Sequence, residues 1–401
     1  MNRSKFTIAG KLSIALALFI GVTAFAQVPR SNHVYIVAEE NRSYEHIVGS
    51  ASMPYLNGLL AKGGVATQFY SNMHGSLENY LIVTSGQYLT HNNDTLAVFN
   101  VDNIERHLLT NGKTFKSYAQ TLPFAGYTGL YSGAYMKRHA PLPYFTEMGN
   151  SSLIKNHVST TELAKDIANG TLPNFAFITP DGNNDMHNCG ANLGACFWTA
   201  DQFLKNTIGP LLATAPFQPG GDGLLIIWAD EADLGSDNRC SATVLTGCGG
   251  HILVAMIGPQ VKAGYKSVTT YHHPSVLRTM LEALGTTANF PSAANTAPDM
   301  REFFKGNAGG TVPSTTAAVV QVSSPTSNTV TGPSVSLAAS ATAPNPVTFM
   351  RIYVDNVSVA SASTSKISAT ISMSKATHSV VYQAWDSKGN VYKAARTITV
   401  Q

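Results

Sequence analysis

Short apolar runs that end in polar residues constrain the fold of this chain more than any other feature. The runs 33–38, 174–179 and 223–228 have the length and the apolar content of buried β-strands. Segments with helical spacing of apolar residues lie between them, among them 53–63 and 201–212. Strands that alternate with helices form a mostly parallel sheet covered by helices on both faces. The sequence therefore predicts an α/β fold with a doubly wound, mostly parallel sheet.

Metal-ligand residue types gather at the predicted strand ends. In an open α/β sheet, ligands bind at the carboxyl ends of the strands. The polar residues that follow the predicted strands, together with a histidine after a glycine pair, are Glu40, Asn41, Asp185, His187, Asp230, Glu231 and His251. Carboxylates and imidazoles in one cleft are typical ligands of divalent cations. We predict a site for one or two such ions, with zinc, manganese, calcium and magnesium as candidates.

The segment 74–86 predicts a hydroxyl group at the start of a helix. Ser76 stands at the N-cap or first-turn position, and Gly86 ends the helical pattern. The positive end of the helix dipole suits a serine oxygen that meets phosphorus or a metal ion. For this segment alone, an ordinary serine cap is the alternative.

Two other groups of basic side chains have competing interpretations. Lys137 and His139 lie in a proline-bounded loop, where they would hold phosphate or protonate a leaving group, or simply form a solvated basic loop. His272 and His273 precede a predicted helix, and we interpret them as capping or surface residues.

Residues 1–26 have the layout of a cleaved signal peptide. Arg3, Lys5 and Lys11 precede or border a short apolar run, and Ala24 to Ala26 resemble a cleavage site. We therefore expect a secreted or periplasmic protein without stable membrane insertion, because no run approaches the length of a membrane span. Removing these three positive charges takes the formal charge from +3 to 0. Bulk charge therefore argues against nucleic acid as a partner.

The cysteines form two close pairs, Cys189 with Cys196 and Cys240 with Cys248. In an exported protein, this spacing predicts two short-loop disulfides. A zinc site is the alternative, but it favours tighter spacing of the thiolates.

The C-terminal part of the chain differs in composition from the rest. Residues 306–318 are rich in Gly, Ser, Thr and Pro, which predicts a linker after a catalytic domain over 27–305. Residues 319–401 contain short alternating runs separated by turn residues, which predicts a small all-β sandwich. This part resembles bacterial immunoglobulin-like domains, particularly in 351–360. We assign it to attachment or spacing, with possible contact to a cell surface or polysaccharide.

Six stretches between residues 33 and 284 together carry a family resemblance. In chain order they read EENRSYEHIVG, HGSLENYLIVTSG, KRHAPLPYF, TPDGNNDMHN, WADEAD and GGHILVAMIGP. They resemble the bacterial phosphoesterase family that contains acid phosphatases and non-specific phospholipases C, within the alkaline phosphatase superfamily. The resemblance implies an alkaline phosphatase type of sheet and hydrolysis of phosphoric esters.

The resemblance also implies roles for individual residues. One metal position would be surrounded by Glu40, Ser76, Asp230 and Glu231, and a second by Asp185, His187 and His251. Related nucleotide phosphodiesterases share the spacing of Ser76, Asn79 and Gly86, which implies that Ser76 is the nucleophile and Asn79 a donor to a phosphoryl oxygen. The Glu40–Asn41 pair and Glu231 depart from the usual superfamily ligands, so the number and identity of the ions stay open. The Pro and Arg of sulfatase motifs do not follow Ser76, which disfavours sulfate esters.

Three functions follow as hypotheses. The first is a secreted, metal-dependent, acid phosphatase-like hydrolase that forms a phosphoseryl intermediate. The second is a phospholipase C-type phosphodiesterase, which needs an apolar approach for lipid; no long apolar insertion stands out near the site, so a water-soluble monoester is favoured. The third is a cell-surface binding protein on an inactive phosphoesterase fold, against which the retention of Ser76 with the acids and histidines argues.

Overall fold

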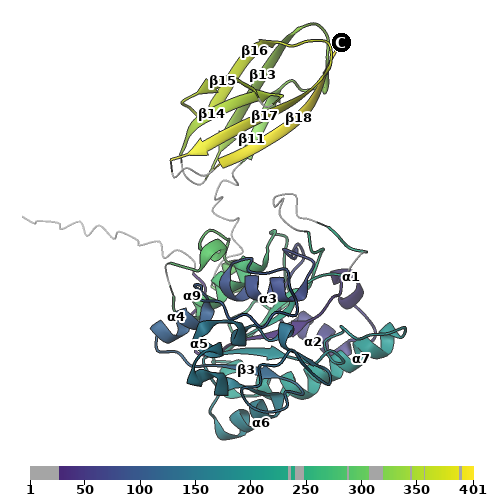
Figure 1. The fold of residues 1–401 in the computed structure, drawn as a ribbon, viewed down its shortest axis with the longest axis vertical. Helices are drawn as coiled ribbons and strands as arrows, with labels where there is room; N and C mark the ends of the chain where they lie inside the picture. The colour runs from purple at the N-terminus through teal and green to yellow at the C-terminus, as the bar shows by residue number, and fades with distance from the viewer. Residues whose placement is uncertain are drawn as a thin grey trace, which may run out of the picture. The chain divides into compact units, whose positions relative to one another are not determined.

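The computed structural model describes residues 27–233, 236–239, 248–286, 289–306, 319–343, 346–355, 357–387 and 391–401. The chain forms two compact units, residues 1–308 and 309–401. The predicted signal peptide, residues 307–318 of the predicted linker, and Cys240 lie outside the described residues. Figure 1 shows the elements of both units.

The first unit is built on an eight-stranded sheet with the strand order β10-β2-β9-β8-β1-β7-β3-β6. In chain order the strands are β1 (Val34–Glu39), β2 (Gly64–Ala66), β3 (Phe115–Ala119), β6 (His157–Ser159), β7 (Phe175–Thr179), β8 (Leu224–Ala229), β9 (Val254–Ile257) and β10 (Tyr265–Ser267). The pairs of β1 with β7 and β8, of β3 with β6 and β7, and of β2 with β10 are parallel. Only β9 pairs antiparallel with both neighbours in this sheet, so the prediction of a mostly parallel sheet is confirmed.

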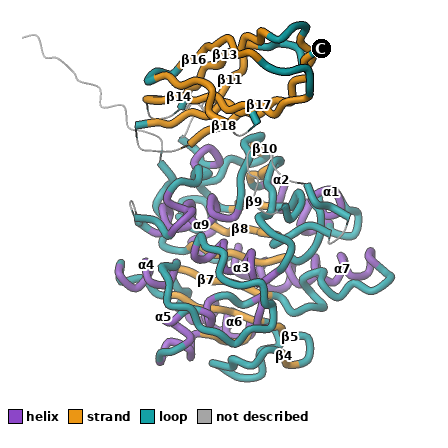
Figure 2. Tube along the Cα trace, turned by 45° about the horizontal axis from the view of Figure 1, so that its top comes forward, coloured by secondary structure: helices purple, strands orange, loops and turns teal. Residues whose placement is uncertain are grey.

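Helices surround this sheet (Figures 1 and 2). They are α1 (Tyr44–Ile47), α2 (Pro54–Lys62), α3 (Ser76–Ser85), α4 (Ile104–Thr110), α5 (Thr146–Gly149), α6 (Thr160–Asn169), α7 (Leu193–Phe203), α8 (Gly209–Leu212) and α9 (His273–Leu284). Helix α9 packs against α3 and α4, whereas α2 packs against α7 and α6 packs against α8. The helix predicted from residue 201 begins earlier, because the Asn192 side chain accepts a hydrogen bond from Ala195 N and caps α7 there.

The central strands account for the long apolar runs of the sequence. Every residue of β1, β7 and β8 is buried. Strand β1 pairs with β7 on one side and β8 on the other, so both of its edges are covered. Because all of its side chains are buried, both of its faces are covered as well. Parallel strands in this position have near-continuous apolar sequences rather than alternating ones. The polar residues directly after these strands therefore lie side by side at one edge of the sheet.

The second unit is all-β, as predicted. Its strands are β11 (Val319–Ser324), β12 (Thr329–Val330), β13 (Ser334–Thr342), β14 (Val347–Val354), β15 (Val357–Ala362), β16 (Lys366–Ser372), β17 (Thr377–Asp386) and β18 (Val391–Val400). They form two sheets, β11-β13-β16 and β12-β18-β17-β14-β15, whose inner faces share one apolar core that includes Leu337, Ile352 and Tyr382. Buried and exposed residues alternate along β13 and β17, which is typical of a sandwich. The immunoglobulin-like assignment itself stays a prediction.

A buried histidine in β6 makes the stability of the first unit depend on pH. His157 Nδ1 lies 3.0 Å from Ser117 Oγ and Nε2 lies 3.1 Å from Tyr135 Oη. Burial, reinforced by the charge of Lys137, lowers the pKa of His157 to about 3. The unfolded chain then binds a proton below pH ~6.5 that the folded chain does not, so stability falls as pH falls.

We expect this one group to reduce the free energy of unfolding by about 2 kcal/mol between pH 7 and pH 5. Urea unfolding of the wild type and of His157→Leu at both pH values measures the effect, because the variant lacks the titrating group. The stability difference between the two proteins should shrink by that amount at pH 5. A difference that does not change with pH would contradict the burial of a neutral imidazole.

Candidate active site

Three neighbouring strand ends bring the predicted acidic residues together. Glu40 follows β1, Asp185 lies in the loop after β7, and Asp230 and Glu231 follow β8. Because β1 lies between β7 and β8, backbone hydrogen bonds continue past the strand ends: Glu40 N donates to Asp185 O at 2.7 Å, and Asp230 N donates to Glu39 O at 3.2 Å. The parallel sheet thus fixes the spacing between these carboxylates.

Ser76 directs its hydroxyl group into this cluster. Its Oγ donates to Glu40 Oε2 at 3.1 Å and lies 3.4 Å from Glu231 Oε1. The helix cap is Gly75, with φ of 145°, a value that residues with a Cβ rarely adopt, and Gly75 N donates to Glu231 Oε2 at 3.0 Å. Ser76 is therefore the first residue of α3 rather than its cap, and its hydroxyl is held between two carboxylates.

Asn41 joins the same group. Its backbone has a positive φ of 46°, and its N–H donates to Asp230 Oδ1 at 3.1 Å. With its amide nitrogen toward the acids, its side chain donates to Glu40 Oε2 at 3.0 Å and to Glu231 Oε1 at 3.2 Å. The structure therefore brings together all of the residues predicted for the first metal position.

His139 links Glu40 to Asp185. Its Nδ1 lies 3.1 Å from Asp185 Oδ2, and its Nε2 lies 3.3 Å from Glu40 Oε1. Tyr80 Oη donates to the same Glu40 oxygen at 2.5 Å, and its ring stacks on His139 with centroids 5.5 Å apart. Tyr80 was not among the predicted site residues, although it stands four positions after Ser76, on the same face of α3.

The electrostatics of the cluster favour a bound cation. Burial, followed by repulsion from neighbouring carboxylates, raises the pKa of Glu40 and Asp230 well above the usual range, and burial raises that of Asp185 to about 7. Burial lowers the pKa of His139 well below its usual value, so its imidazole is neutral and able to act as a ligand.

The side chains of the cluster also fit a metal ion geometrically. Glu40, His139 and Asp185 each offer a ligand atom, and these atoms lie within 4.8 Å of one another. Asp230 Oδ2 is buried without a hydrogen-bond partner. Buried carboxylates of this kind are neutralised either by protonation or by a bound cation, and the O and N donor set matches that of divalent ions.

The structure corrects the predicted second ligand group. His251 Nδ1 lies 2.9 Å from Glu45 Oε1 and Nε2 lies 3.0 Å from Thr67 O, so both ring nitrogens have partners outside the cluster. The reason is strand order: His251 precedes β9, three strands away from β7, which corresponds to about 14 Å of sheet. Asp185 has His139 as its imidazole partner instead. His187 is half-buried, and its ring centroid lies 5.4 Å from that of His139.

Other predicted side chains lie differently from the expectation. Asn79 holds the loop before Ser76, since its amide oxygen accepts from Met73 N at 3.1 Å and its nitrogen donates to Met73 O at 2.9 Å. Asn79 therefore supports the loop before Ser76, and the predicted phosphoryl contact would compete with these bonds. Lys137 is buried, with its ammonium 4.1 Å from the centroid of the Tyr144 ring, and burial lowers its pKa to about 8.

Two histidines that contact the cluster were missed or misinterpreted from sequence. His74 Nδ1 lies 2.8 Å from Glu231 Oε2, and its Nε2 lies 2.9 Å from Asp237 O, which orients the Glu231 carboxylate. The hydrogen bond to Glu231 raises the pKa of His74. His273, which we interpreted as a capping or surface residue, is fully buried behind Asp230. The signal for His74 was its place in the motif 74–86.

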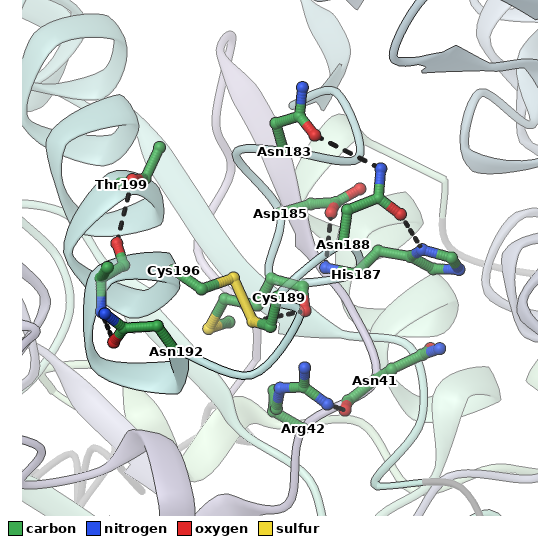
Figure 3. The surroundings of a disulfide bond; sticks show 12 residues. Asn41, Arg42, Asn183, Asp185, His187, Asn188, Cys189, Asn192, Cys196 and Thr199 are labelled. Atoms are coloured by element: carbon green, nitrogen blue, oxygen red, sulfur yellow. Dashed lines mark hydrogen bonds between the residues drawn. A yellow bond between two sulfur atoms is a disulfide. The ribbon is translucent and has the colours of Figure 1, made fainter.

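A disulfide fastens the loop that carries Asp185 and His187 (Figure 3). Cys189 is bonded to Cys196 in α7, which confirms the first predicted pair. Within the loop, Asp185 Oδ1 accepts from His187 N at 2.8 Å, and Met186 between them is buried with a positive φ of 76°. The disulfide and the buried Met186 together hold Asp185 toward His139.

Comparison with known proteins identifies the family of the chain. Residues 50–285 match the model of the Phosphoesterase family. The chain is 30% identical over 268 residues to the phosphatidylinositol-3-phosphatase of Mycobacterium tuberculosis, covering 66% of this chain and 81% of that protein. It is 28% identical over 254 residues to a probable acid phosphatase of Kluyveromyces lactis, covering 61% of this chain and 56% of that protein.

Among solved structures, a protein of the alkaline phosphatase superfamily from Vibrio parahaemolyticus aligns over 92% of this chain and 83% of its own, with a TM-score of 0.47 and 12% sequence identity. The family match covers more than half of the chain and includes Ser76, Asp185 and Asp230. The chain therefore belongs to the Phosphoesterase family, the members of which hydrolyse phosphoric esters.

Proposed function

We propose that this protein is an exported, metal-dependent phosphomonoesterase of the acid phosphatase type, with Ser76 as its nucleophile. One observation carries the proposal: Ser76 Oγ is the first side chain of α3 and lies within 3.1 Å of Glu40 Oε2 and 3.4 Å of Glu231 Oε1, inside a group of buried carboxylates. A serine in this position has both a base for its proton and a site for the cation that offsets phosphate charge.

The side chains would share the steps as follows. Ser76 Oγ attacks phosphorus while its proton passes to Glu40 or Glu231, the P–O bond to the alcohol breaks, and the proton becomes available to the departing alkoxide. Water then attacks the phosphoseryl group, releases phosphate and restores the hydroxyl group. A divalent ion bound by Glu40, Ser76, Asp230 and Glu231, with Asn41 beside it, would lower the pKa of the hydroxyl and offset the charge of the phosphoryl oxygens.

A lipid phosphate is the second candidate substrate. The name of the mycobacterial relative specifies a phosphatidylinositol 3-phosphate, in which the scissile group is also a phosphomonoester. The phospholipase C alternative differs in bond, since it cleaves a diester. All three candidate reactions would use the same metal site and the same nucleophile. Only a comparison of the rates on different substrates can therefore distinguish them.

The experiment is a substrate panel on metal-stripped and metal-restored protein. It compares p-nitrophenyl phosphate, bis(p-nitrophenyl) phosphate and phosphatidylinositol 3-phosphate in vesicles. We expect no activity after chelation, recovery with a divalent ion, and faster cleavage of the monoesters than of the diester. Full activity in protein shown to be free of divalent metal would refute the metal-dependent mechanism, and faster diester cleavage would favour the phospholipase C function.

Export is part of the proposal. The Cys189–Cys196 disulfide is typical of an oxidising compartment, and residues 1–26 have the composition of a signal peptide. Among the residues that the structure describes, none of the helices combines the length and the apolar character of a membrane span. Export predicts that the mature chain begins near Gln27, which N-terminal sequencing of the secreted protein can test.

The β unit is proposed to be dispensable for small substrates. Each unit has its own apolar core, and every residue proposed to build or support the site, including His273, lies in the first unit. A protein shortened after residue 307 should therefore fold and keep kcat/KM for p-nitrophenyl phosphate within about twofold of the full chain. Metal content measured in parallel serves as the control. A loss of activity on the small ester with unchanged metal content would show that residues 319–401 help to build the site.

A further inference from the structure

His273 lies directly behind the pair of acids that would bind the metal ion. It is the first residue of α9, its side chain is fully buried, and it contacts the backbone of Asp230 and the side chains of Ser71 and Trp228. We propose that His273 is a positioning residue that fixes the Asp230–Glu231 peptide and thereby the directions of both carboxylates. This inference rests on the proposed metal-dependent function.

The hydrogen bonds define which nitrogen of His273 carries the proton. Trp228 Nε1 can only donate, and it lies 2.9 Å from His273 Nδ1, so Nδ1 must accept. The proton of the neutral ring is therefore on Nε2. That nitrogen lies 3.0 Å from Asp230 O and 3.1 Å from Ser71 Oγ, where its N–H acts as the donor. A single tautomer thus satisfies every contact of the ring.

Asp230 O, which accepts the hydrogen bond from His273 Nε2, belongs to the peptide between Asp230 and Glu231. Ser71 Oγ donates to the same oxygen at 2.7 Å, so Asp230 O is held from two sides. A peptide group is planar, so Asp230 O lies in one plane with the Cα atoms of Asp230 and Glu231, and holding this oxygen restricts the rotation of that plane. In the preceding peptide, between Ala229 and Asp230, Asp230 N donates to Glu39 O at 3.2 Å. The backbone between the two ligands has little freedom left.

The same contacts connect the acids to the nucleophile loop. Ser71 Oγ lies 3.1 Å from Met73 O. The backbone N–H and carbonyl groups of Met73 both form hydrogen bonds with the Asn79 side chain. His273 N donates to Asn72 Oδ1 at 3.2 Å, which joins the start of α9 to the same segment. Helix α9, the end of β8 and the loop before Ser76 therefore meet at one imidazole ring.

The test measures metal affinity in the absence of turnover. Metal-free full-length protein is titrated with Mn²⁺, and the free ion is counted by its electron paramagnetic resonance signal. Residues that orient ligands typically change metal affinity by about 10–100-fold when they are replaced, so His273→Leu should weaken Mn²⁺ binding by that factor. His273→Gln, whose amide N–H can approach the position of Nε2, should lie closer to the wild type.

His157→Leu is the matched control. It also removes a buried histidine with two hydrogen bonds from the first unit, but its partners, Ser117 and Tyr135, are outside the cluster. It should lower thermal stability and leave Mn²⁺ affinity unchanged. If His273→Leu does not fold, Ser71→Ala decides, since it removes the other donor to Asp230 O and should weaken binding by up to about tenfold.

Several outcomes would overturn the inference. One is a folded His273→Leu protein that binds Mn²⁺ within twofold of the wild type, and another is an equal loss of affinity in the His157→Leu control. The third applies if His273→Leu does not fold: it is a Ser71→Ala protein that binds Mn²⁺ as tightly as the wild type. A wild-type protein that binds none of Mn²⁺, Zn²⁺, Ca²⁺ and Mg²⁺ would overturn the metal-dependent function itself. This result is distinguishable because it does not depend on any variant.

Discussion

Replacement of Ser76 by alanine is expected to lower kcat by a factor on the order of 10⁴–10⁶, because the variant lacks the hydroxyl group proposed to form the covalent phosphoryl intermediate. The fold should survive, since Ser76 makes no capping bond in α3 and loses only its hydrogen bonds to Glu40 and Glu231. Such a loss costs about 1–3 kcal/mol of stability. Steady-state kinetics on p-nitrophenyl phosphate together with thermal unfolding measure both quantities.

A second measurement tests directly for the proposed phosphoseryl intermediate. Acid quenching of the wild-type protein during turnover, followed by mass spectrometry of the peptide containing Ser76, should show added phosphate that the alanine variant lacks. Ser85→Ala is the matched control, because Ser85 is a buried serine of the same helix whose hydroxyl donates to Leu81 O. Turnover by Ser76→Ala at the wild-type rate would rule out the serine mechanism.

The sheet could be predicted from sequence because its central strands are buried on both faces. Strands such as β1 and β8 appear in the sequence as continuous apolar runs, and a polar residue after each run marks the strand end. The residues that follow β1 and β8 were therefore placed together correctly, since these strands are neighbours in the sheet. Sequence order alone gives no such information about more distant strands.

The errors about the site arise because sequence order does not show which distant segments meet in space. His251 follows the acids in chain order, but β9 is inserted antiparallel at a position three strands from β7, and no sequence pattern marks that insertion. His139 reaches Asp185 from a single 3₁₀ turn, Lys137–His139, which is too short for hydrophobic periodicity to give a signal. His273 appeared to be a surface cap because burial of a polar ring depends on partners, here Trp228 and Ser71, that are distant in sequence.

Replacement of Asp230 by asparagine is expected to change metal affinity and metal-free stability in opposite directions. Asp230 Oδ2 is buried without a hydrogen-bond partner, and burial together with repulsion from Glu231 raises the pKa of this carboxyl well above its usual range. A negative charge on Asp230 is therefore unfavourable in the metal-free protein. Asparagine removes that charge while its amide oxygen can still accept the bond from Asn41 N.

The variant should bind Mn²⁺ at least about 100-fold more weakly, because one anionic ligand is lost, yet its metal-free form should unfold at an equal or higher temperature than the metal-free wild type. Asp166→Asn is the control: this carboxyl accepts bonds from Lys116 Nζ and Tyr118 Oη away from the cluster. Its loss should lower stability and leave metal affinity unchanged. If Asp230 were purely structural, its replacement would resemble that of Asp166. Asp230→Asn would then destabilise the metal-free protein without weakening Mn²⁺ binding. That result would mean that the metal site lies elsewhere.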